Sequence, residues 1–310
     1  MTSTILTTNR LWAYLQLMRP ANIVTAWADI LAGVAASGFL TIFYEEIKQG
    51  LLLSNFLPLG YLLIATSCLY SGGVVLNDAF DASLDALERP ERPIPSGRAS
   101  RQGAFIIGSF LLCLGIVFAT LVSSLSAILA ASIALFAVLY DGFGKHHPFW
   151  GPLNMGVCRG GNLLLGISIV PVMVSKYWFL ALIPIIYIAA ITNLSRGEVK
   201  GGNNFNSVVS LILFSVVFGA IFGLGLVNNY DLLPVLPFAL FLAIRVFVPI
   251  ITVLREPSPT NIASAVRAGV LSMIVLNATL STGFAGLLYG LLVLTLLPIS
   301  RKLAKAFAVT

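Results

Sequence analysis

The feature that most constrains the fold is a set of long apolar runs. Residues 103–122, 207–227 and 269–297 contain no charged side chain, and each run is long enough for a helix to cross a bilayer, which takes about 20 residues. Only α-helices and closed barrels satisfy their backbone hydrogen bonds in lipid, and these runs are continuous where barrel strands would alternate. The sequence therefore predicts an all-α polytopic membrane protein.

The hydropathy pattern predicts about nine membrane-spanning helices in a single domain, 1–310, because no linker or change of composition divides the chain. The last predicted span is long, and it is either tilted or broken near Gly283. The predicted spans are 21–43, 56–77, 103–123, 126–141, 151–172, 177–194, 207–227, 232–254 and 265–297.

The distribution of Lys and Arg predicts the orientation, because cytoplasmic loops carry an excess of these residues. With the N-terminus inside, the loops after the second, fourth and sixth spans are cytoplasmic and hold most of the basic residues. An odd number of spans then places Arg301, Lys302 and Lys305 outside. A bacterial inner membrane is the simplest location. No basic block is interleaved with aromatic residues, so the net charge of +6 does not indicate a nucleic-acid partner.

Charge is concentrated in residues 77–98, NDAFDASLDALERPERPIPSGR, in a chain that is only 10% charged. Asn77, Asp81 and Asp85 recur every four residues and share one face of a helix, with Asp78 close to the same edge. Carboxylates grouped beside an apolar cavity repel one another and need a cation. Their oxygens suit Mg²⁺, which typically bridges protein carboxylates and a substrate phosphate. The alternative is a solvated acidic loop.

The second half of this segment supplies the opposite charge. Its three prolines prevent a helix and hold the chain extended. Arg89, Arg92 and Arg98 can then reach carboxylates or a diphosphate, which the planar guanidinium group binds well. For Arg89 a role as a positive-inside anchor is equally compatible.

The string NDxxDxxxD followed by RPxRPIPSG resembles the signature of the UbiA superfamily of intramembrane prenyltransferases, and RPAN (19–22) and YDGFGK (140–145) extend the resemblance. It implies a helical bundle around a central cavity that opens to membrane lipid. There an isoprenyl diphosphate binds through Mg²⁺, loses diphosphate and alkylates a lipophilic or aromatic acceptor. By this resemblance Asn77, Asp78, Asp81 and Asp85 hold Mg²⁺, the three aspartates act with Lys145 in catalysis, and Arg92 and Lys145 contact the diphosphate.

Arg159 and Asn162 lie three residues apart on one face of the fifth predicted span. An arginine inside a span is unfavourable and usually functional, so we expect both residues to face the cavity and bind substrate. The alternative is that Arg159 extends to the membrane interface.

The segment after the sixth span departs from the family pattern. Family members usually carry a second aspartate-rich motif here, whereas residues 193–204 read NLSRGEVKGGNN and contain one acid. The candidate substrate contacts are Asn193, Arg196, Glu198 and Lys200, and a lysine can neutralise a diphosphate where a metal would otherwise do so. The strings NLSRGEVKGG and CRGxN are similar to EboC-type UbiA-like proteins. Two functions stay open: a prenyltransferase, or a non-catalytic relative that binds or exports a prenyl or lipid precursor.

Overall fold

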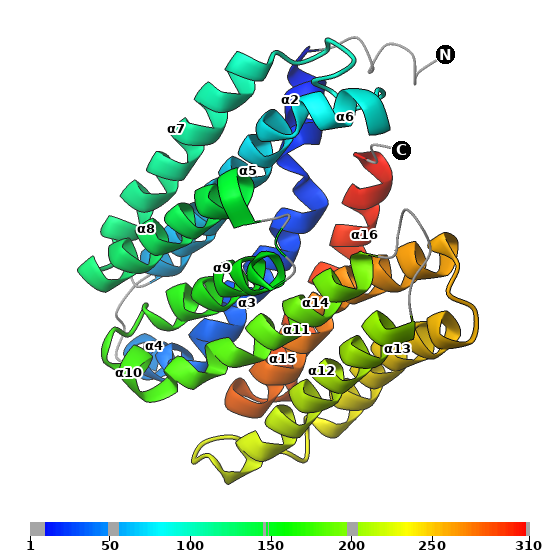
Figure 1. Cartoon of the computed structure of the whole chain (residues 1–310). Coiled ribbons are helices and arrows are strands. Elements are labelled where there is room, and N and C mark those ends of the chain that lie inside the picture. The colour runs from blue at the N-terminus through cyan, green and yellow to red at the C-terminus, as the bar shows by residue number, and fades with distance from the viewer. Residues whose placement is uncertain (1–9, 49–55, 145–146, 148, 197–203, 308–310) are drawn as a thin grey trace.

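The computed structural model describes residues 10–48, 56–144, 147, 149–196 and 204–307, and every regular element within them is a helix (Figure 1). This confirms the all-α fold class. The first half of the bundle contains α2 (Arg10–Met18), α3 (Pro20–Ala36), α4 (Phe39–Lys48), α5 (Leu57–Phe80), α6 (Ala82–Glu88), α7 (Arg101–Thr120) and α8 (Ser124–Leu139) with its π-helical extension η2 (Tyr140–Gly144).

The second half contains α9 (Trp150–Ile167), α10 (Val172–Tyr177), η3 (Trp178–Ala181), α11 (Leu182–Ser195), α12 (Asn204–Gly223), η4 (Leu224–Leu226), α13 (Leu236–Arg255), α14 (Pro259–Ala285), α15 (Leu287–Leu294) and α16 (Leu296–Ala306). Among the described residues, 8 helical segments are long and apolar enough to cross a membrane. The shorter α3 and the more polar α9 run through the same bundle (Figure 1).

The last predicted span, 265–297, is broken, which was one of the two interpretations that the sequence left open. Helix α14 ends at Ala285, and Gly286 takes a φ of 83°, a left-handed value that glycine adopts without strain. The chain then reverses, and α15 and α16 run back along the bundle (Figure 1). Ser300 of α16 donates a hydrogen bond to the carbonyl of Ala21 at 2.8 Å, which ties the returning helix to the start of α3.

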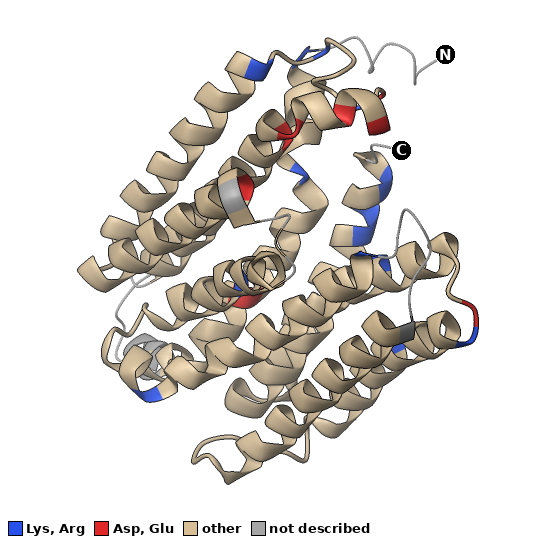
Figure 2. Cartoon of the chain, in the orientation of Figure 1, with Lys and Arg blue, Asp and Glu red and all other residues tan. Residues whose placement is uncertain are grey.

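This return corrects the predicted position of the C-terminal basic residues. The ring of Phe307 stacks on Trp12 of α2 with centroids 4.4 Å apart, so both described ends of the chain lie at one end of the bundle. Arg301, Lys302 and Lys305 therefore lie at the end that holds the acidic motif, and Figure 2 shows blue and red residues gathered there. The prediction that they lie on the opposite side was wrong because it took α14 and the following helices as one span.

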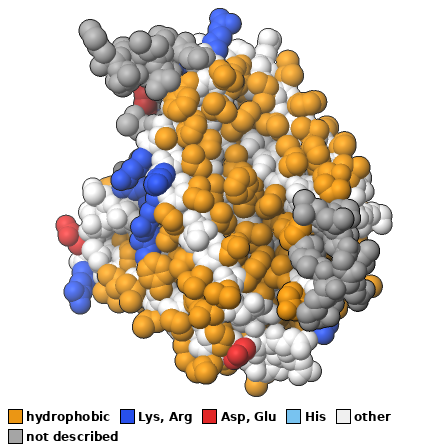
Figure 3. All heavy atoms as spheres, turned by 180° about the vertical axis from the view of Figure 1, so that it is seen from behind, with side chains coloured by type: hydrophobic (Ala, Val, Ile, Leu, Met, Phe, Trp, Pro, Cys, Tyr) orange, Lys and Arg blue, Asp and Glu red, His pale blue; other side chains and the backbone are white. Residues whose placement is uncertain are grey.

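The outer surface of the bundle is apolar, as a lipid environment requires. Ile106 and Phe110 of α7 are 70% and 63% exposed, and Leu288 of α15 is 83% exposed. Figure 3 shows a face over which hydrophobic side chains predominate, with most of the basic side chains gathered toward one side of it. Exposed apolar surface on this scale is unstable in water and indicates a membrane-spanning bundle.

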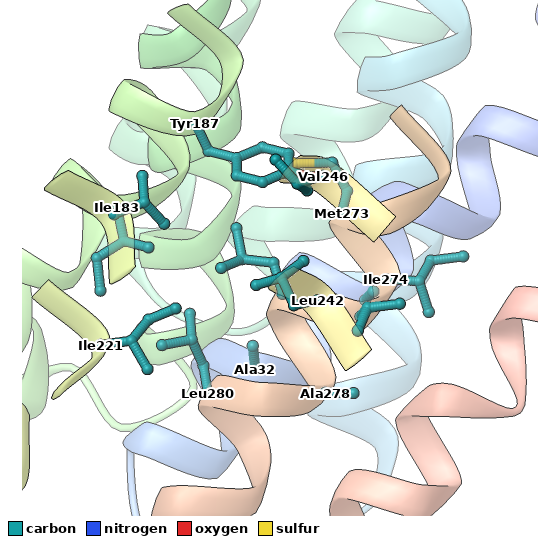
Figure 4. Packing of buried hydrophobic residues seen from close by; sticks show 14 of the residues in the cluster. Ala32, Ile183, Tyr187, Ile221, Leu242, Val246, Met273, Ile274, Ala278 and Leu280 are labelled. Atoms are coloured by element: carbon teal, nitrogen blue, oxygen red, sulfur yellow. The ribbon is translucent and has the colours of Figure 1, made fainter. Parts of the chain in front are cut away.

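The main hydrophobic core lies among α11, α12, α13 and α14, against α3 and α9. Figure 4 shows Tyr187, Leu242 and Val246 directed toward Met273 of α14. The buried hydroxyl of Tyr187 donates to the carbonyl of Gly269 at 2.9 Å, so this aromatic side chain leaves no polar group unsatisfied.

Glycines bring α3 and α9 into backbone contact. A Cβ atom placed on Gly33 would collide with the carbonyl oxygen of Leu163, and one placed on Gly166 would collide with the carbonyl oxygen of Ile30. Small residues allow this approach in membrane helices, where close packing drives association. The contact also brings together buried polar residues of α3 and α9.

We predict that Gly166→Val destabilises the protein by about 2 kcal/mol or more, because the opposing backbone cannot move aside as a flexible side chain would. Gly219→Val in α12 is the matched control, since its Cβ would meet open space. Thermal unfolding of the two variants in detergent measures the difference. Equal melting temperatures would show that α3 and α9 do not pack as closely as described.

Candidate active site

The acidic motif lies at one end of α5 and continues around a bend into α6. The backbone N–H of Asp81 donates to the carbonyl of Asn77 at 2.9 Å, and that of Asp85 donates to Asp81 at 2.8 Å. The helical spacing predicted from sequence is therefore kept across the bend. The carboxylates of Asp78 and Asp85 are both buried against the loop that follows.

Arg92 connects these two carboxylates. Its Nη1 atom lies 2.7 Å from Asp85 Oδ2 and 3.6 Å from Asp78 Oδ1. One positive nitrogen thus stands between two acids that are seven residues apart, which relieves the repulsion expected between them. The predicted pairing of the arginine-rich segment with the motif is present in the structure.

Arg19 is a second partner of the motif that the sequence analysis did not foresee. Its Nη2 atom donates to Asp78 Oδ1 at 2.6 Å. Arg19 directly precedes α3 and has a left-handed backbone with φ of 50°, which is unfavourable for a residue with a Cβ. Burial acts to lower the pKa of Arg19 and the Asp78 carboxylate acts to raise it, and the net direction is upward, so the guanidinium stays charged.

The proline-rich loop is held in place by Arg98, which contacts neither acid of the motif. Its guanidinium donates to Ser96 Oγ at 3.0 Å, to Gln16 Oε1 at 2.9 Å and to the carbonyl of Glu91 at 2.8 Å. Gly97 has a φ of 76°, and this left-handed turn allows the chain to enter α7. Arg98 therefore ties the loop to α2 and so fixes Arg92.

A pocket of about 500 Å³ opens beside this cluster. Three arginines, Arg19, Arg89 and Arg92, line it together with the Asp78 carboxylate. Ala304 and Phe307, at the C-terminal end of α16 and beyond it, form part of the wall. Three guanidinium groups against two lining acids, Asp78 and Glu91, leave the pocket positive and suited to an anion.

Asn77 turns toward α8 and the adjoining π-helical turn. Its Nδ2 atom donates to Asp141 Oδ1 at 2.8 Å. The neighbouring Tyr140 interacts electrostatically with Asp81, Asp141 and Arg19. The structure therefore brings the predicted YDGFGK string to the motif, while Lys145 of that string lies outside the described residues.

Arg159 and Asn162 lie deeper, in a buried polar network that centres on Asp29 of α3. Arg159 Nη1 is 3.1 Å from Asp29 Oδ2, and its Nη2 donates to Thr25 Oγ1 at 2.7 Å. Asn162 Nδ2 donates to Asp29 Oδ2 at 3.1 Å. Arg159 therefore does not extend to the membrane interface, because an acid inside the bundle pairs with it.

Two further helices join this network. Asn277 of α14 donates to Asp29 Oδ1 at 2.6 Å, and Thr66 of α5 donates to Asn162 Oδ1 at 2.6 Å. The sequence analysis missed Asp29 and Asn277. The signal that could have found Asp29 is the rule that an acid inside a span needs a partner, since Asp29 lies within the first predicted span.

Tyr70 lies between the network and the motif. The Arg159 guanidinium carbon is 5.7 Å from the centre of the Tyr70 ring, and Tyr70 lies on α5 about two helical turns before Asp78. Polar and charged side chains thus continue from Arg92 at the end of the bundle to Asp29 in its interior.

The predicted residues of the segment after the sixth span are placed only in part. Asn193 of α11 donates from Nδ2 to the carbonyl of Asn206 at 2.8 Å and to Ser210 Oγ at 3.1 Å, and so joins α11 to α12. Arg196 follows the end of α11. Glu198 and Lys200 lie outside the described residues. Their substrate roles stay predictions.

The side chains of the first motif can offer oxygen ligands, which Mg²⁺ prefers. The carboxylates of Asp78 and Asp85 also lie close enough to share one cationic nitrogen, that of Arg92. Within the residues that the structure describes, no three His, Cys, Asp or Glu side chains form a ready-made metal site. Mg²⁺ is often held by one or two carboxylates and completed by substrate phosphate. Asp78 and Asp85 can play this part.

The bundle and this pocket define a membrane protein with a charged site at one end of an apolar interior. Residues 49–265 match the family described as the UbiA prenyltransferase family. This match covers more than half of the chain, which therefore belongs to that family. The narrower resemblance to EboC-type proteins stays a prediction.

The relatives found by sequence include digeranylgeranylglyceryl phosphate synthase of Methanosarcina mazei, which is 33% identical over 162 residues. These cover 50% of this chain and 54% of that protein. The protein of the same name from Saccharolobus solfataricus is 29% identical, with 63% of this chain and 64% of that one covered. The chain spans about half of the length of the first of these relatives.

Two solved structures share the fold. A structure of digeranylgeranylglyceryl phosphate synthase superposes with a TM-score of 0.63 at 19% identity, covering 88% of this chain and 98% of that one. A UbiA homologue from Aeropyrum pernix in its apo form gives 0.64 at 14% identity, with 83% and 96% covered.

We predict that Asp29→Ala destabilises the protein by about 3–5 kcal/mol, because it leaves the Arg159 charge buried without its partner. The double variant Asp29→Ala with Arg159→Met removes both charges and is expected to recover much of this loss. Thermal unfolding in detergent measures each protein. Additive effects of the two substitutions would contradict the pairing.

Proposed function

We propose that this protein is a Mg²⁺-dependent prenyltransferase that transfers an isoprenyl group from a prenyl diphosphate to a lipophilic acceptor inside the membrane. The observation that carries the proposal is the pocket in which Arg19, Arg89 and Arg92 meet the Asp78 carboxylate at one end of an apolar bundle. A prenyl diphosphate has a charged head, which suits the pocket, and a long apolar tail, which suits the interior of the bundle beside it.

The arginines bind the diphosphate. Arg19 and Arg92 are anchored by Asp78 and Asp85, and the N–H groups of each guanidinium that are not engaged there can donate hydrogen bonds to phosphate oxygens. Mg²⁺, when bound, supplies further positive charge that makes diphosphate a better leaving group. Arg98 keeps the loop fixed, so Arg92 is held in position before the substrate arrives.

The reaction breaks the bond between the allylic carbon and the diphosphate oxygen, and the bonding electrons leave with the diphosphate. A lone pair or π-electron pair of the acceptor forms the new bond to carbon, and the acceptor loses a proton. The apolar helices that surround the site exclude water, which would otherwise capture the electron-poor carbon.

The acceptor that we propose is a glyceryl phosphate lipid. The name of the relatives, digeranylgeranylglyceryl phosphate synthase, favours a glyceryl phosphate lipid over an aromatic ring. Arg159 and Asn162 are the proposed acceptor contacts among the described residues, since Arg159 points from the buried network toward Tyr70. Lys145, Asn193, Arg196, Glu198 and Lys200 stay proposed contacts, and Asp81 and Asn77 stay proposed metal ligands.

We also propose that the motif end of the bundle faces the cytoplasm. Arg301, Lys302 and Lys305 lie at this end, together with the arginines of the pocket, whereas Lys176 lies near the other end. The returning helix α16 therefore removes the one conflict with the positive-inside rule.

A second candidate is a non-catalytic protein that binds a prenyl or lipid precursor. The observation that favours it is the side chain of Asn193, whose amide is used to join α11 and α12. The segment that carries a second acidic motif in the family thus has a structural contact at its first residue. Binding without turnover would support this candidate.

We predict that geranyl, farnesyl or geranylgeranyl diphosphate releases diphosphate in the presence of Mg²⁺ and an extract of lipid acceptors, and that Asp78→Asn lowers the rate by about 100-fold or more. Loss of one group that stabilises developing charge costs roughly this factor. The measurement is diphosphate release by purified protein in nanodiscs, with and without a chelator.

The matched control is Glu88→Gln, which removes a carboxylate from the exposed end of α6 and should leave the rate unchanged. Mg²⁺-dependent binding without release in any acceptor pool would favour the carrier. Absence of both binding and release would contradict both functions. Release that persists in Asp78→Asn would contradict the role given to the motif.

A further inference from the structure

A second pocket, of about 600 Å³, lies on the other side of the proline-rich loop. It is formed by α2, the start of α6, the loop and the start of α7, and it shares no lining residue with the first pocket. The function proposed above makes no use of it. Its polar side chains are Arg10, Tyr14, Ser83, Arg98, Ser100 and Arg101.

All the charged side chains that line this second pocket are basic. Arg10, Arg98 and Arg101 line it, and none of its lining residues is acidic. Arg98 is occupied by the bonds that hold the loop. Arg101 donates from Nε to the carbonyl of Ala79 at 2.9 Å, and its guanidinium carbon lies 5.7 Å from the centre of the Phe105 ring, so its Nη atoms can still donate to an anion. Arg10 is exposed at the first residue of α2. Two guanidinium groups are therefore available to an anion, beside the hydroxyl groups of Tyr14 and Ser100.

The second pocket lies at the end of the lipid-facing surface where α7 begins. Arg101 is the first residue of α7, and the exposed side chains of Ile106 and Phe110 follow one to three turns further along this helix. On α2, Leu11 is 67% exposed directly after Arg10. Figure 2 shows basic residues at the end of the bundle where α7 begins. An anion in the pocket that carries apolar chains can place those chains along α7.

We propose that this second pocket binds the phosphate headgroup of an anionic membrane lipid. Basic pockets at the interface between helices and the polar face of the bilayer bind such headgroups, and each Lys or Arg near the membrane surface contributes about 1 kcal/mol. A soluble phosphate would use the same arginines but would gain nothing from Ile106, Phe110 and Leu11. The apolar stripe therefore favours a lipid over a free anion.

The site is also connected to the first pocket through the loop. The backbone N–H of Ala99 donates to the carbonyl of Pro93 at 2.9 Å, and Arg98 donates to the carbonyl of Glu91. Ala99 and Arg98 line the lipid pocket, whereas Pro93 and Glu91 line the first pocket. A bound lipid would thus hold one face of the loop whose other face carries Arg92.

The test is lipid retention by the purified protein, measured by native mass spectrometry, and melting temperature with added lipid. Phosphatidylglycerol is compared with phosphatidylcholine and with inorganic phosphate. We expect phosphatidylglycerol to be retained and to raise the melting temperature. The variant with both Arg10→Gln and Arg101→Gln should retain it about 30-fold more weakly, the factor for two lost arginines.

Two variants keep the test independent of folding. Arg10→Gln alone removes an exposed side chain at the start of α2 and should weaken retention by roughly fivefold. Lys176→Gln removes a basic side chain near the opposite end of the bundle and should have no effect on it. Equal retention of the two lipids, or unchanged retention in both arginine variants, would overturn the proposal. Displacement of the lipid by inorganic phosphate at equal concentration would overturn it too, because the occupant would then be a soluble anion.

Discussion

The ion pair between Asp29 and Arg159 is the interaction on which the rest of the bundle depends. A charge inside an apolar bundle is stable only when it is paired and hydrogen-bonded, because the cost of removing it from water is several kcal/mol. Asp29 meets this condition through α9 and α14 at once. The pair therefore fixes the depth of α3, α9 and α14 in the membrane and the rotation of each helix about its axis. Apolar packing alone would not fix depth and rotation, since lipid tails are as apolar as the helix surfaces.

The same physics has a different result at the end of the bundle. In the interior pair the side chains of Arg159 and Asp29 are 10% and 0% exposed, whereas Arg19 and Arg92 are 36% and 18% exposed beside buried aspartates. The interior arginine has no solvent with which to exchange its partner. Arg19 and Arg92 in the pocket are in contact with solvent. A diphosphate can therefore bind the nitrogens that the aspartates leave open, while the aspartates keep the two arginines in place. The interior pair thus organises the fold, and the more exposed pairs of Arg19 and Arg92 line the proposed diphosphate pocket.

The sequence predicted those features whose signal is local. Apolar runs of about 20 residues defined the helices, and the four-residue spacing of Asn77, Asp81 and Asp85 defined one helical face before the contacts were known. Arg19 and Asp29 were missed because their partners lie 59 and 130 positions away in the chain, at Asp78 and Arg159. Nothing in the spacing of neighbours encodes such pairs. The break after α14 was indicated only as one of two alternatives, since glycine is also tolerated within membrane helices.

The site is divided between the region that matches the family and the residues that flank it. The region that matches the family, 49–265, contains the acidic motif, Arg92 and Arg159. Residues outside it supply Arg19 and Asp29 on one side and Phe307 on the other, so the flanks complete both the pocket and the buried network. The shape of the pocket therefore depends on how α2, α3 and α16 close against the matched region.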